Sequence, residues 1–382
     1  MVSWPSYRIG EILEKSDSYI ELDSDTEYQE VTVRLWGKGV ELRGTKMGSE
    51  IGSGRRIQVK TGQFILSKID ARHGAFGLIP GNLNGAVVTN DFPVFNPNLD
   101  LLDPRYLNWL SKTHQFVNAC RYASEGTTNR VRLKEHRFLD INISVPTLDV
   151  QRRLVKKIES LNKKIEEARV LRLEILSDAQ AMLKSVFQKI VEDAPYRTMG
   201  EVAPIVRRPV EIEIDVEYPE LGLRSFGRGT FHKPSLAGID VGSKKLYQIM
   251  PNDLLFSNVF AWEGTIGVVQ SDDIGRVGSH RFISCIAKEL VTTPEFLCFY
   301  LLSEEGMEKI RDASPGGAGR NRTLGLKKLE KIEVPVPNFE RQCWFNSLQK
   351  KVKLINGVQS SNQIQLDALM PAILDKAIGS HW

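Results

Sequence analysis

The chain has 382 residues, of which 41% are hydrophobic and 26% are charged, and its formal net charge is +4. This length predicts two or three domains, and this composition excludes a disordered or collagen-like chain. No apolar run reaches the roughly 18 residues of a membrane-spanning helix, and residues 1–19 lack the apolar core of a signal peptide. The four cysteines are widely separated, which argues against a disulfide framework or a zinc site and fits a reducing cytosol.

A long internal repeat organises the chain. The string WGKG at residues 36–39 returns as FGRG at residues 226–229, a shift of 190 positions. At the same shift, QVKTGQFILSKIDARHGAFG from Gln58 aligns with QIMPNDLLFSNVFAWEGTIG from Gln248. A unit of about 190 residues therefore occurs twice, which is too long a period for a solenoid repeat.

Each unit begins with a strand-rich head. In the first unit the strand patterns are QFILSKI, FGLIP, GAVVTN and FPVF, separated by Gly, Pro, Asn and Asp. One helix is predicted near Pro104–Ala123 and its counterpart near Pro294–Ala313, each with proline at the first position. A loop of small and polar residues and a short strand, INISVP or IEVPVP, then complete the head. The fold class is α+β, with two homologous heads at residues 1–146 and 193–337.

Each unit ends in one long helix, predicted at residues 147–192 and 338–382, with Thr147 and Asn338 as N-caps. Apolar residues recur in these helices at spacings of three and four. They are Leu154, Ile158, Leu161, Ile165 and Ile175 in the first helix, and Leu348, Val352, Ile355, Leu366 and Leu369 in the second. This spacing predicts an antiparallel, coiled-coil-like rod between the heads. Pro371 is expected to kink or end the second helix near Met370.

Polar residues interrupt the apolar stripe in the middle of both helices. They are Arg172 in the first helix and Gln359 and Asn362 in the second. Arg172 either extends along its aliphatic stem into solvent or belongs to a polar layer that fixes the helix register. An Arg172→Leu variant distinguishes the two, because unchanged head spacing and melting would contradict the register hypothesis.

No motif for catalysis or metal binding is present. The chain lacks a GxxxxGK[ST] phosphate loop, an HExxH metal motif, a GxSxG nucleophile motif and an NPPY-type adenine-methyltransferase loop. The six histidines have no ligand spacing. We therefore predict no catalytic residue, no metal ligand and no cofactor in this chain.

Basic and polar residues instead gather at equivalent positions of the two heads. In the first head they are Arg34, Lys38, Arg43, Lys46, Arg72, His73, Thr127, Thr128, Asn129 and Arg130. In the second head they are Arg224, Arg228, His232, Lys233, Trp262, His280, Arg281, Arg320, Asn321 and Arg322. Arg and Asn suit contacts to base edges, and Thr and Lys suit phosphates, so these loops are candidate DNA contacts. The alternative is a set of ordinary solvated loops that diverged after duplication.

The order of these motifs resembles the specificity (S) subunit of type I restriction–modification systems. The resemblance covers nearly the whole chain and is carried by FILSKIDARHGAFGLIP, PRYLNWL, SEGTTNRVRL, INISVPTLDVQ, LLFSNVFAWEGTIG, GGAGRNR, IEVPVPNFERQ and LDALMPAILDKAIGS. It departs in the second head, where ASPGGAGRNR replaces the Gly-Thr-Thr string of the first.

The resemblance implies a function and a set of partners. Each head would be a target recognition domain that reads one half of a split, asymmetric site in double-stranded DNA. The long helices would dock two modification (methyltransferase) subunits, which carry S-adenosylmethionine. Two restriction (motor-nuclease) subunits, with ATP and Mg²⁺, would join for DNA cleavage. This non-catalytic chain would act in the cytoplasm. Two other hypotheses stay open: a stand-alone two-headed DNA-binding regulator, and a DNA-modifying enzyme with an unrecognised site.

Overall fold

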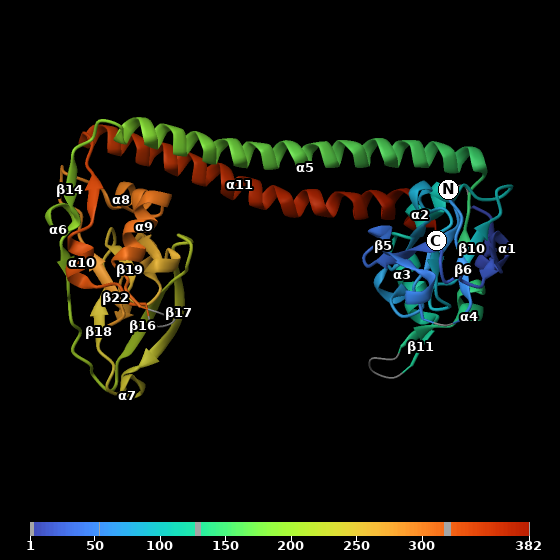
Figure 1. Cartoon of the computed structure of the whole chain (residues 1–382), viewed down its shortest axis with the longest axis horizontal. Coiled ribbons are helices and arrows are strands. Elements are labelled where there is room, and N and C mark those ends of the chain that lie inside the picture. The colour runs from blue at the N-terminus through green and yellow to red at the C-terminus, as the bar shows by residue number, and fades with distance from the viewer. Residues whose placement is uncertain (1–3, 53, 127–130, 317–321, 382) are drawn as a thin grey trace. The chain divides into compact units, whose positions relative to one another are not determined.

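The computed structural model describes residues 4–52, 54–126, 131–316 and 322–381, with the side chains of 359–361 and 381 left aside (Figure 1). The chain divides into two compact units. The first comprises Met1–Leu173 with Gln359–Trp382, and the second comprises Glu174–Val358. Each unit thus contains one head and a part of both long helices. Within the described ranges, no helix is long and apolar enough to cross a membrane.

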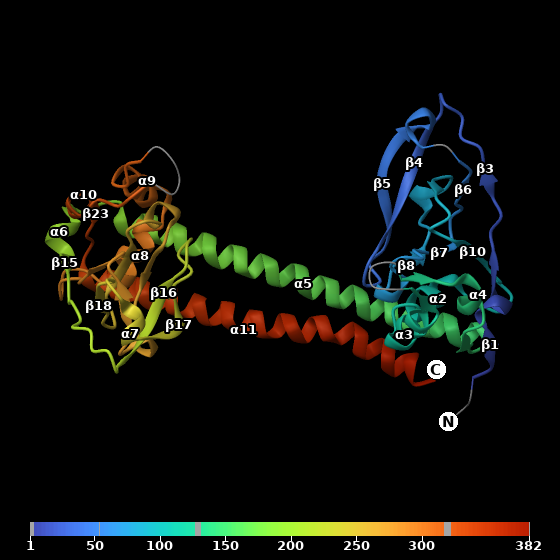
Figure 2. The ribbon, with the colours of Figure 1, turned by 90° about the horizontal axis from the view of Figure 1, so that it is seen from below.

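The first head is built on two sheets. The five-stranded sheet has the order β3 (Tyr19–Ile20), β6 (Arg56–Gln58), β9 (Val87–Val88), β4 (Glu27–Arg34) and β5 (Gly39–Met47). The four-stranded sheet has the order β2 (Leu13–Lys15), β10 (Val94–Pro97), β7 (Phe64–Leu66) and β8 (Phe76–Leu78). Strands β4 and β5 form a long antiparallel hairpin, which Figure 2 shows along one side of this head. Short elements complete it: β1 (Ser6–Arg8), paired with β13 (Asn142–Ser144), α1 (Ile9–Ile12), β11 (Ser124–Glu125), β12 (Arg132–Leu133) and α4 (Glu135–Leu139).

The second head repeats this plan. One sheet has the order β15 (Ile205–Val206), β22 (Phe282–Cys285), β19 (Leu254–Ser257) and β20 (Ile266–Val268). The other has the order β17 (Thr230–Ala237), β16 (Glu217–Leu223), β21 (Val277–Ser279) and β18 (Leu246–Gln248). The remaining short elements are β14 (Tyr196–Thr198), paired with β23 (Glu333–Pro335), α6 (Met199–Val202), α7 (Gly238–Val241) and α10 (Leu326–Glu330). Ile65 pairs with Gly77 in the first head and Leu255 with Gly267 in the second. The predicted strands and the duplication are therefore confirmed, although the strands are shorter than the predicted runs.

The prediction of a single helix in each head was wrong, because each of these segments forms two helices. The first becomes α2 (Pro104–Leu110) and α3 (His114–Tyr122), and the second becomes α8 (Pro294–Leu301) and α9 (Glu304–Asp312). The break has the same cause in both. Thr113 Oγ1 accepts a hydrogen bond from the Phe116 amide, and Ser303 Oγ accepts one from the Gly306 amide. Each residue is the N-cap of a new helix.

The long helices are α5 (Leu148–Val191), with 44 residues, and α11 (Phe339–Ala377), with 39. They begin directly after the predicted caps, and Asn338 Oδ1 accepts a 2.8 Å hydrogen bond from the Glu340 amide. The expectation that Pro371 kinks or ends α11 near Met370 was wrong about the helix end, since α11 continues for another six residues beyond Pro371, to Ala377. Leu374 lies in this last stretch and is packed into the first head's core, and this burial stabilises the helix beyond the proline.

Both helices contribute to both cores, so they run antiparallel. In the first unit, Ile158 of α5 and Leu374 of α11 are buried in one cluster with Phe116. In the second unit, the rings of Phe187 of α5 and Phe345 of α11 lie 5.5 Å apart, in a cluster with buried side chains of the head. The residues that follow the second head therefore complete the core of the first.

The apolar stripe is not buried along its whole length. Ile158, Ile165 and Val352 are buried, and Leu154, Leu161, Leu348 and Leu366 are half-buried. Ile175, Ile355 and Leu369 are 42–45% exposed. Burial is thus greatest where a helix also packs against a head. Arg172 is half-buried and the Gln359 side chain lies outside the described residues, so the register hypothesis stays a prediction.

A buried glutamine attaches each long helix to its head in the same way. Gln151 Nε2 donates to the carbonyls of Leu101 and Pro146, at 2.8 and 2.7 Å, and its Oε1 accepts from the Asp103 amide at 2.8 Å. Gln342 repeats this arrangement with Val291, Pro337 and Thr293, the residues at the matching positions. The aligned glutamines of the repeat are therefore structural anchors.

Candidate nucleic-acid interface

The long hairpin of each head ends in a tip that is fixed to a neighbouring 3₁₀ turn. These turns are η2 (Ala71–His73) and η5 (Ala261–Glu263). The amides of Trp36 and Gly37 donate to the carbonyls of His73 and Gly74, at 2.8 and 2.9 Å. The amides of Phe226 and Gly227 donate to the carbonyls of Glu263 and Gly264, at 3.1 and 2.8 Å. The backbone of the tip is thus held in the same place in both heads.

The hairpin cations of the first head divide into paired and unpaired groups. Arg34 Nε lies 2.7 Å from a Glu41 oxygen, and Lys46 Nζ lies 2.9 Å from a Glu30 oxygen. Lys38 and Arg43 are exposed and form no ion pair with another described residue. They are the hairpin side chains that are free to meet a phosphate or a base edge.

Side chains on the 3₁₀ turns face the hairpin tips. In the first head, Arg72 Nε donates to His73 Nε2 at 3.1 Å, and the His73 ring lies 5.8 Å from the Trp36 ring. In the second head, Trp262 donates through Nε1 to the Val259 carbonyl, and the Arg322 guanidinium lies 5.3 Å from the Trp262 ring centroid. The predicted residues Arg72 and His73, and likewise Trp262 and Arg322, are therefore brought together on one surface of their head.

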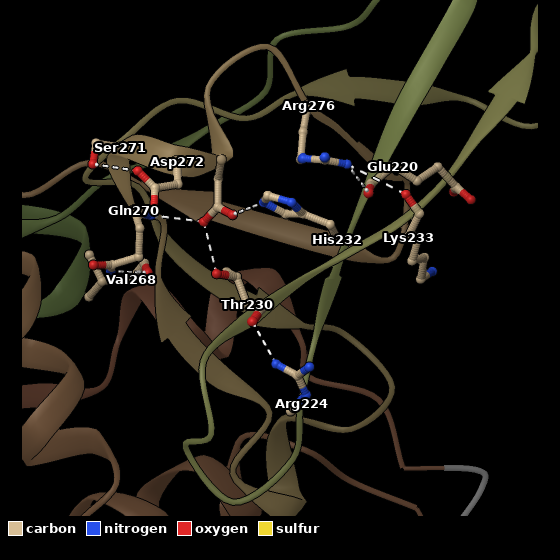
Figure 3. Close-up of polar contacts among 11 residues, drawn as sticks. Glu220, Arg224, Thr230, His232, Lys233, Val268, Gln270, Ser271, Asp272 and Arg276 are labelled. Atoms are coloured by element: carbon tan, nitrogen blue, oxygen red, sulfur yellow. Dashed lines mark hydrogen bonds and ion pairs between the residues drawn. The ribbon is translucent and has the colours of Figure 1, made fainter. Parts of the chain in front are cut away.

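The hairpin of the second head carries a polar cluster (Figure 3). Asp273 of η6 (Ser271–Asp273) is buried, and its carboxylate lies 3.1 Å from His232 Nε2 and accepts a 2.8 Å hydrogen bond from Thr230 Oγ1. Arg224 donates to the Thr230 carbonyl at 2.8 Å, with its guanidinium 4.6 Å from the Phe231 ring centroid. The cluster holds the imidazole of His232 and the guanidinium of Arg224 at the surface in defined orientations.

The other predicted residues lie as follows. Arg228 is exposed over the Phe226 ring, at 5.6 Å, and Lys233 is half-buried on β17. His280 and Arg281 are exposed in the turn before β22. Thr127, Thr128, Asn129, Arg130, Arg320 and Asn321 lie outside the described residues.

Lys68 shows that a basic residue beside this surface can have a structural role. It forms an ion pair with Glu135, to which Lys15 also binds, at 2.5 Å. Burial favours a higher pKa for Glu135, but the hydrogen bonds from the two lysines outweigh it and lower the pKa. Lys68 is therefore engaged inside the protein.

Two features escaped the sequence reasoning. The role of Asp273 in orienting His232 depends on a contact between residues 41 positions apart, and no local pattern signals it. The exposed rings of Trp36 and Phe226 had a visible signal, because an aromatic residue precedes glycine at the same place in both repeats. The described residues include no group of three or more His, Cys, Asp or Glu side chains placed to hold a metal ion.

Comparisons with known proteins agree with this architecture. Residues 1–174 match the family model described as the type I restriction modification DNA specificity domain. The specificity subunit of the type I restriction enzyme HindI of Haemophilus influenzae is 26% identical over 132 residues, which are 34% of this chain and 28% of that protein. The chain thus spans less than a third of the length of this curated relative.

Solved structures extend the likeness in fold to the whole chain. The HsdS subunit of Thermoanaerobacter tengcongensis has a TM-score of 0.64 at 19% identity, covering 100% of this chain and 98% of that one. A chain from a structure on complex assembly and conformational transition of the type I R-M system has a TM-score of 0.68 at 19% identity, covering 99% and 98%. The whole chain therefore shares its fold with these two structures. Its first 174 residues match the type I restriction modification DNA specificity domain.

Proposed function

We propose that this chain is the DNA-recognition subunit of a type I restriction–modification complex. Residues 1–146 and 193–337 are its target recognition domains, and residues 147–192 and 338–382 are its two long conserved helices. Each domain reads one half of an asymmetric, bipartite site in double-stranded DNA. The chain positions two methyltransferase subunits, and for cleavage two restriction subunits, on that site.

One observation carries this proposal. Two heads with the same strand register and the same hairpin-tip hydrogen bonds present different side chains at matching positions. Arg72 and His73 in the first head correspond to Trp262 and Glu263 in the second. A shared frame with different displayed groups suits the reading of two different half-sites.

The partners supply the chemistry in this proposal. S-adenosylmethionine belongs to the methyltransferase subunits, and ATP and Mg²⁺ belong to the restriction subunits, while this chain acts without a cofactor of its own. The exposed apolar residues of α5 and α11, among them Ile175 and Ile355, support docking of partner subunits along the helices. We place the complex in the cytoplasm, where it has access to chromosomal DNA.

Methylation mapping tests the proposal. The chain is co-expressed with the methyltransferase encoded beside it, and methylated adenines are mapped across the genome by single-molecule sequencing. We expect a split, asymmetric motif that disappears when this chain is deleted, and a change in only one half of the motif when residues 1–146 are exchanged. Absence of both methylation and a stable complex with the methyltransferase would contradict the proposal.

A further inference from the structure

The tips of the two hairpins carry an unusual residue. Trp36 and Phe226 both have φ of 61°, and the glycines after them have φ of 65° and 64°. Positive φ at both central residues is the pattern of a type I′ turn, which favours Asn-Gly. For a bulky residue this backbone conformation is an outlier that costs free energy. Both heads accept this cost at the same place.

The rest of the tip is shaped to hold this conformation. A Cβ atom on Gly37 would lie 3.0 Å from Lys112 Cγ, and one on Gly227 would lie 2.6 Å from Leu302 Cδ1. Both tips therefore pack closely against the turn between the two short helices of their head, and their amides are bound to the 3₁₀ turns as described above. The aromatic residue is thereby held firmly in the strained conformation.

Burial of the ring does not offset the strain. Trp36 is 70% exposed and Phe226 is 71% exposed. A folded protein gains little from rings left in water, so burial does not explain the strained conformation. Leu290 is equally strained and exposed, so the tips are distinguished by their aromatic rings, their repetition in both heads and their basic neighbours.

The surroundings of both rings are basic. Lys38 is exposed two positions after Trp36 and the His73 ring lies 5.8 Å from the Trp36 ring, while Arg228 lies 5.6 Å from the ring centroid of Phe226. Phe226 also borders an open hollow of about 600 Å³ with Trp262, Arg311 and Arg322. Glu263 lines the same hollow, where its carboxylate accepts a 3.4 Å hydrogen bond from Ser225. Exposed rings among cations are the combination that stacks on nucleic-acid bases while neutralising phosphates.

We propose that Trp36 and Phe226 are DNA-contacting residues, each of which stacks its ring on bases or sugars of its own half-site. The proposal rests on the DNA-reading function proposed above and adds a contact from the hairpin tips to it. The strained turn fixes the ring in its binding position before DNA arrives, so little side-chain freedom is lost on binding.

Asparagine variants test this contact. Asparagine tolerates the left-handed conformation, so Trp36→Asn and Phe226→Asn remove the ring without disturbing the turn. In the complex with the methyltransferase, we expect each variant to bind a duplex carrying the mapped motif about tenfold or more weakly, with an unchanged or higher melting temperature. Trp36→Phe, which keeps a ring, should retain most of the affinity.

The matched control is Leu290→Asn. Leu290 is 79% exposed with φ of 59°, and it lies in a turn whose Thr292 hydrogen-bonds Gln342 at the start of α11. It shares the strain and exposure of the tip residues and should leave DNA binding unchanged. A second readout uses 2-aminopurine placed through each half-site. Trp36→Asn should abolish the fluorescence change in one half-site and Phe226→Asn in the other.

The outcomes separate this inference from the proposed function. Wild-type affinity in both asparagine variants would overturn the inference and leave the DNA-reading function intact. Loss of affinity matched by a lower melting temperature would also overturn it, because the ring would then be structural. A wild-type complex that neither binds nor methylates DNA would contradict the proposed function first.

Discussion

The two heads differ at three matching positions of the hairpin and its neighbouring turn. The first head has Val40, Leu42 and Leu83, and the second has Thr230, His232 and Asp273. In the first head Val40 packs against the apolar cluster that contains the buried Leu83, whereas in the second the same place holds a carboxylate bound by a hydroxyl and an imidazole. The strand pairing is the same, because Val31 pairs with Leu42 and Leu221 pairs with His232. The frame thus tolerates exchange of an apolar contact for a polar one.

A second buried position also differs in polarity between the two heads. Asp253 of the second head is buried and forms a two-point ion pair with Arg208, at 2.7 and 3.0 Å. Its counterpart in the first head, Gln63, is hydrogen-bonded to Ser16 and Asn96, at 3.3 and 2.8 Å. Both side chains also accept a hydrogen bond from a backbone amide three residues earlier. The hydrogen bond to the backbone amide is therefore kept in both heads, while the side chain is neutral in the first and charged in the second.

Replacing the buried glutamines should give the largest loss of stability, and the loss should be equal in the two heads. Gln151→Leu and Gln342→Leu each remove the hydrogen-bond partner of three buried or half-buried backbone groups, which predicts a loss of about 3–5 kcal/mol of unfolding free energy. Urea unfolding measures the loss, and hydrogen–deuterium exchange assigns it to a head. Gln188→Leu, on an exposed position of α5, should change stability by less than about 0.5 kcal/mol. Clearly unequal losses would contradict a shared frame.

Removing the buried acid of the second head should cost more stability than removing the matching glutamine of the first. Asp253→Ala leaves Arg208 half-buried without its partner and should cost about 2–4 kcal/mol, whereas Gln63→Ala should cost about 1–2 kcal/mol. The double variant Arg208→Met/Asp253→Leu should recover most of the loss, because no uncompensated charge remains. Equal losses in the two single variants would show that the charge adds nothing to the amide network.

The hairpin cluster should affect DNA binding more than folding. His232→Leu removes one oriented donor from the second head and should weaken binding of the methyltransferase complex to its motif by about 1 kcal/mol, or roughly fivefold. The triple variant Thr230→Val/His232→Leu/Asp273→Leu copies the first head and should fold as well as the wild type. If the His232→Leu variant methylates the same second half-site as the wild type, His232 does not contribute to recognition of that half-site.

The smallest expected effect is the acid response of one ion pair in the first head. The folded-state pKa of Glu135 lies below its usual value of 4.5. The stabilisation is therefore complete above that value and is lost as the pH falls through the lower folded-state pKa. Lys68→Met should reduce this acid dependence by about 1 kcal/mol or less, as measured by urea unfolding between neutral and acidic pH. The second head has Leu326 at the matching position and lacks this ion pair, but the pKa of its Glu305 is also lowered, against the effect of burial, by hydrogen bonds from Lys309 and Tyr300, so that head keeps an acid response of its own.

Local patterns predicted much of the fold correctly. The strands at Phe64–Leu66 and Phe76–Leu78 follow from short apolar runs bounded by turn residues, and their repeats follow from the duplication. The starts of both long helices follow from their caps. The break between α2 and α3 also had a local signal in Thr113, which was missed within a continuous apolar pattern.

The candidate site was less accessible to sequence reasoning. Lys38 and Lys46 look alike as exposed hairpin lysines, yet Lys46 is paired with Glu30 on the neighbouring strand. Lys68 is held by Glu135, which lies 67 positions further along the chain. Whether a cation is free depends on which carboxylate the fold brings to it, and sequence spacing does not encode that distance.

By itself, the sequence determined the duplication, the strand-rich heads, the long helices and the absence of recognised catalytic motifs, because these are properties of composition and local periodicity. The tertiary structure alone decided that the end of α11 completes the first head's core, that Asp273 orients His232, and that Trp36 and Phe226 are held strained and exposed. These features arise from contacts between residues far apart in the chain. Their free energies depend on burial and on neighbouring charges, which exist only once the chain has folded.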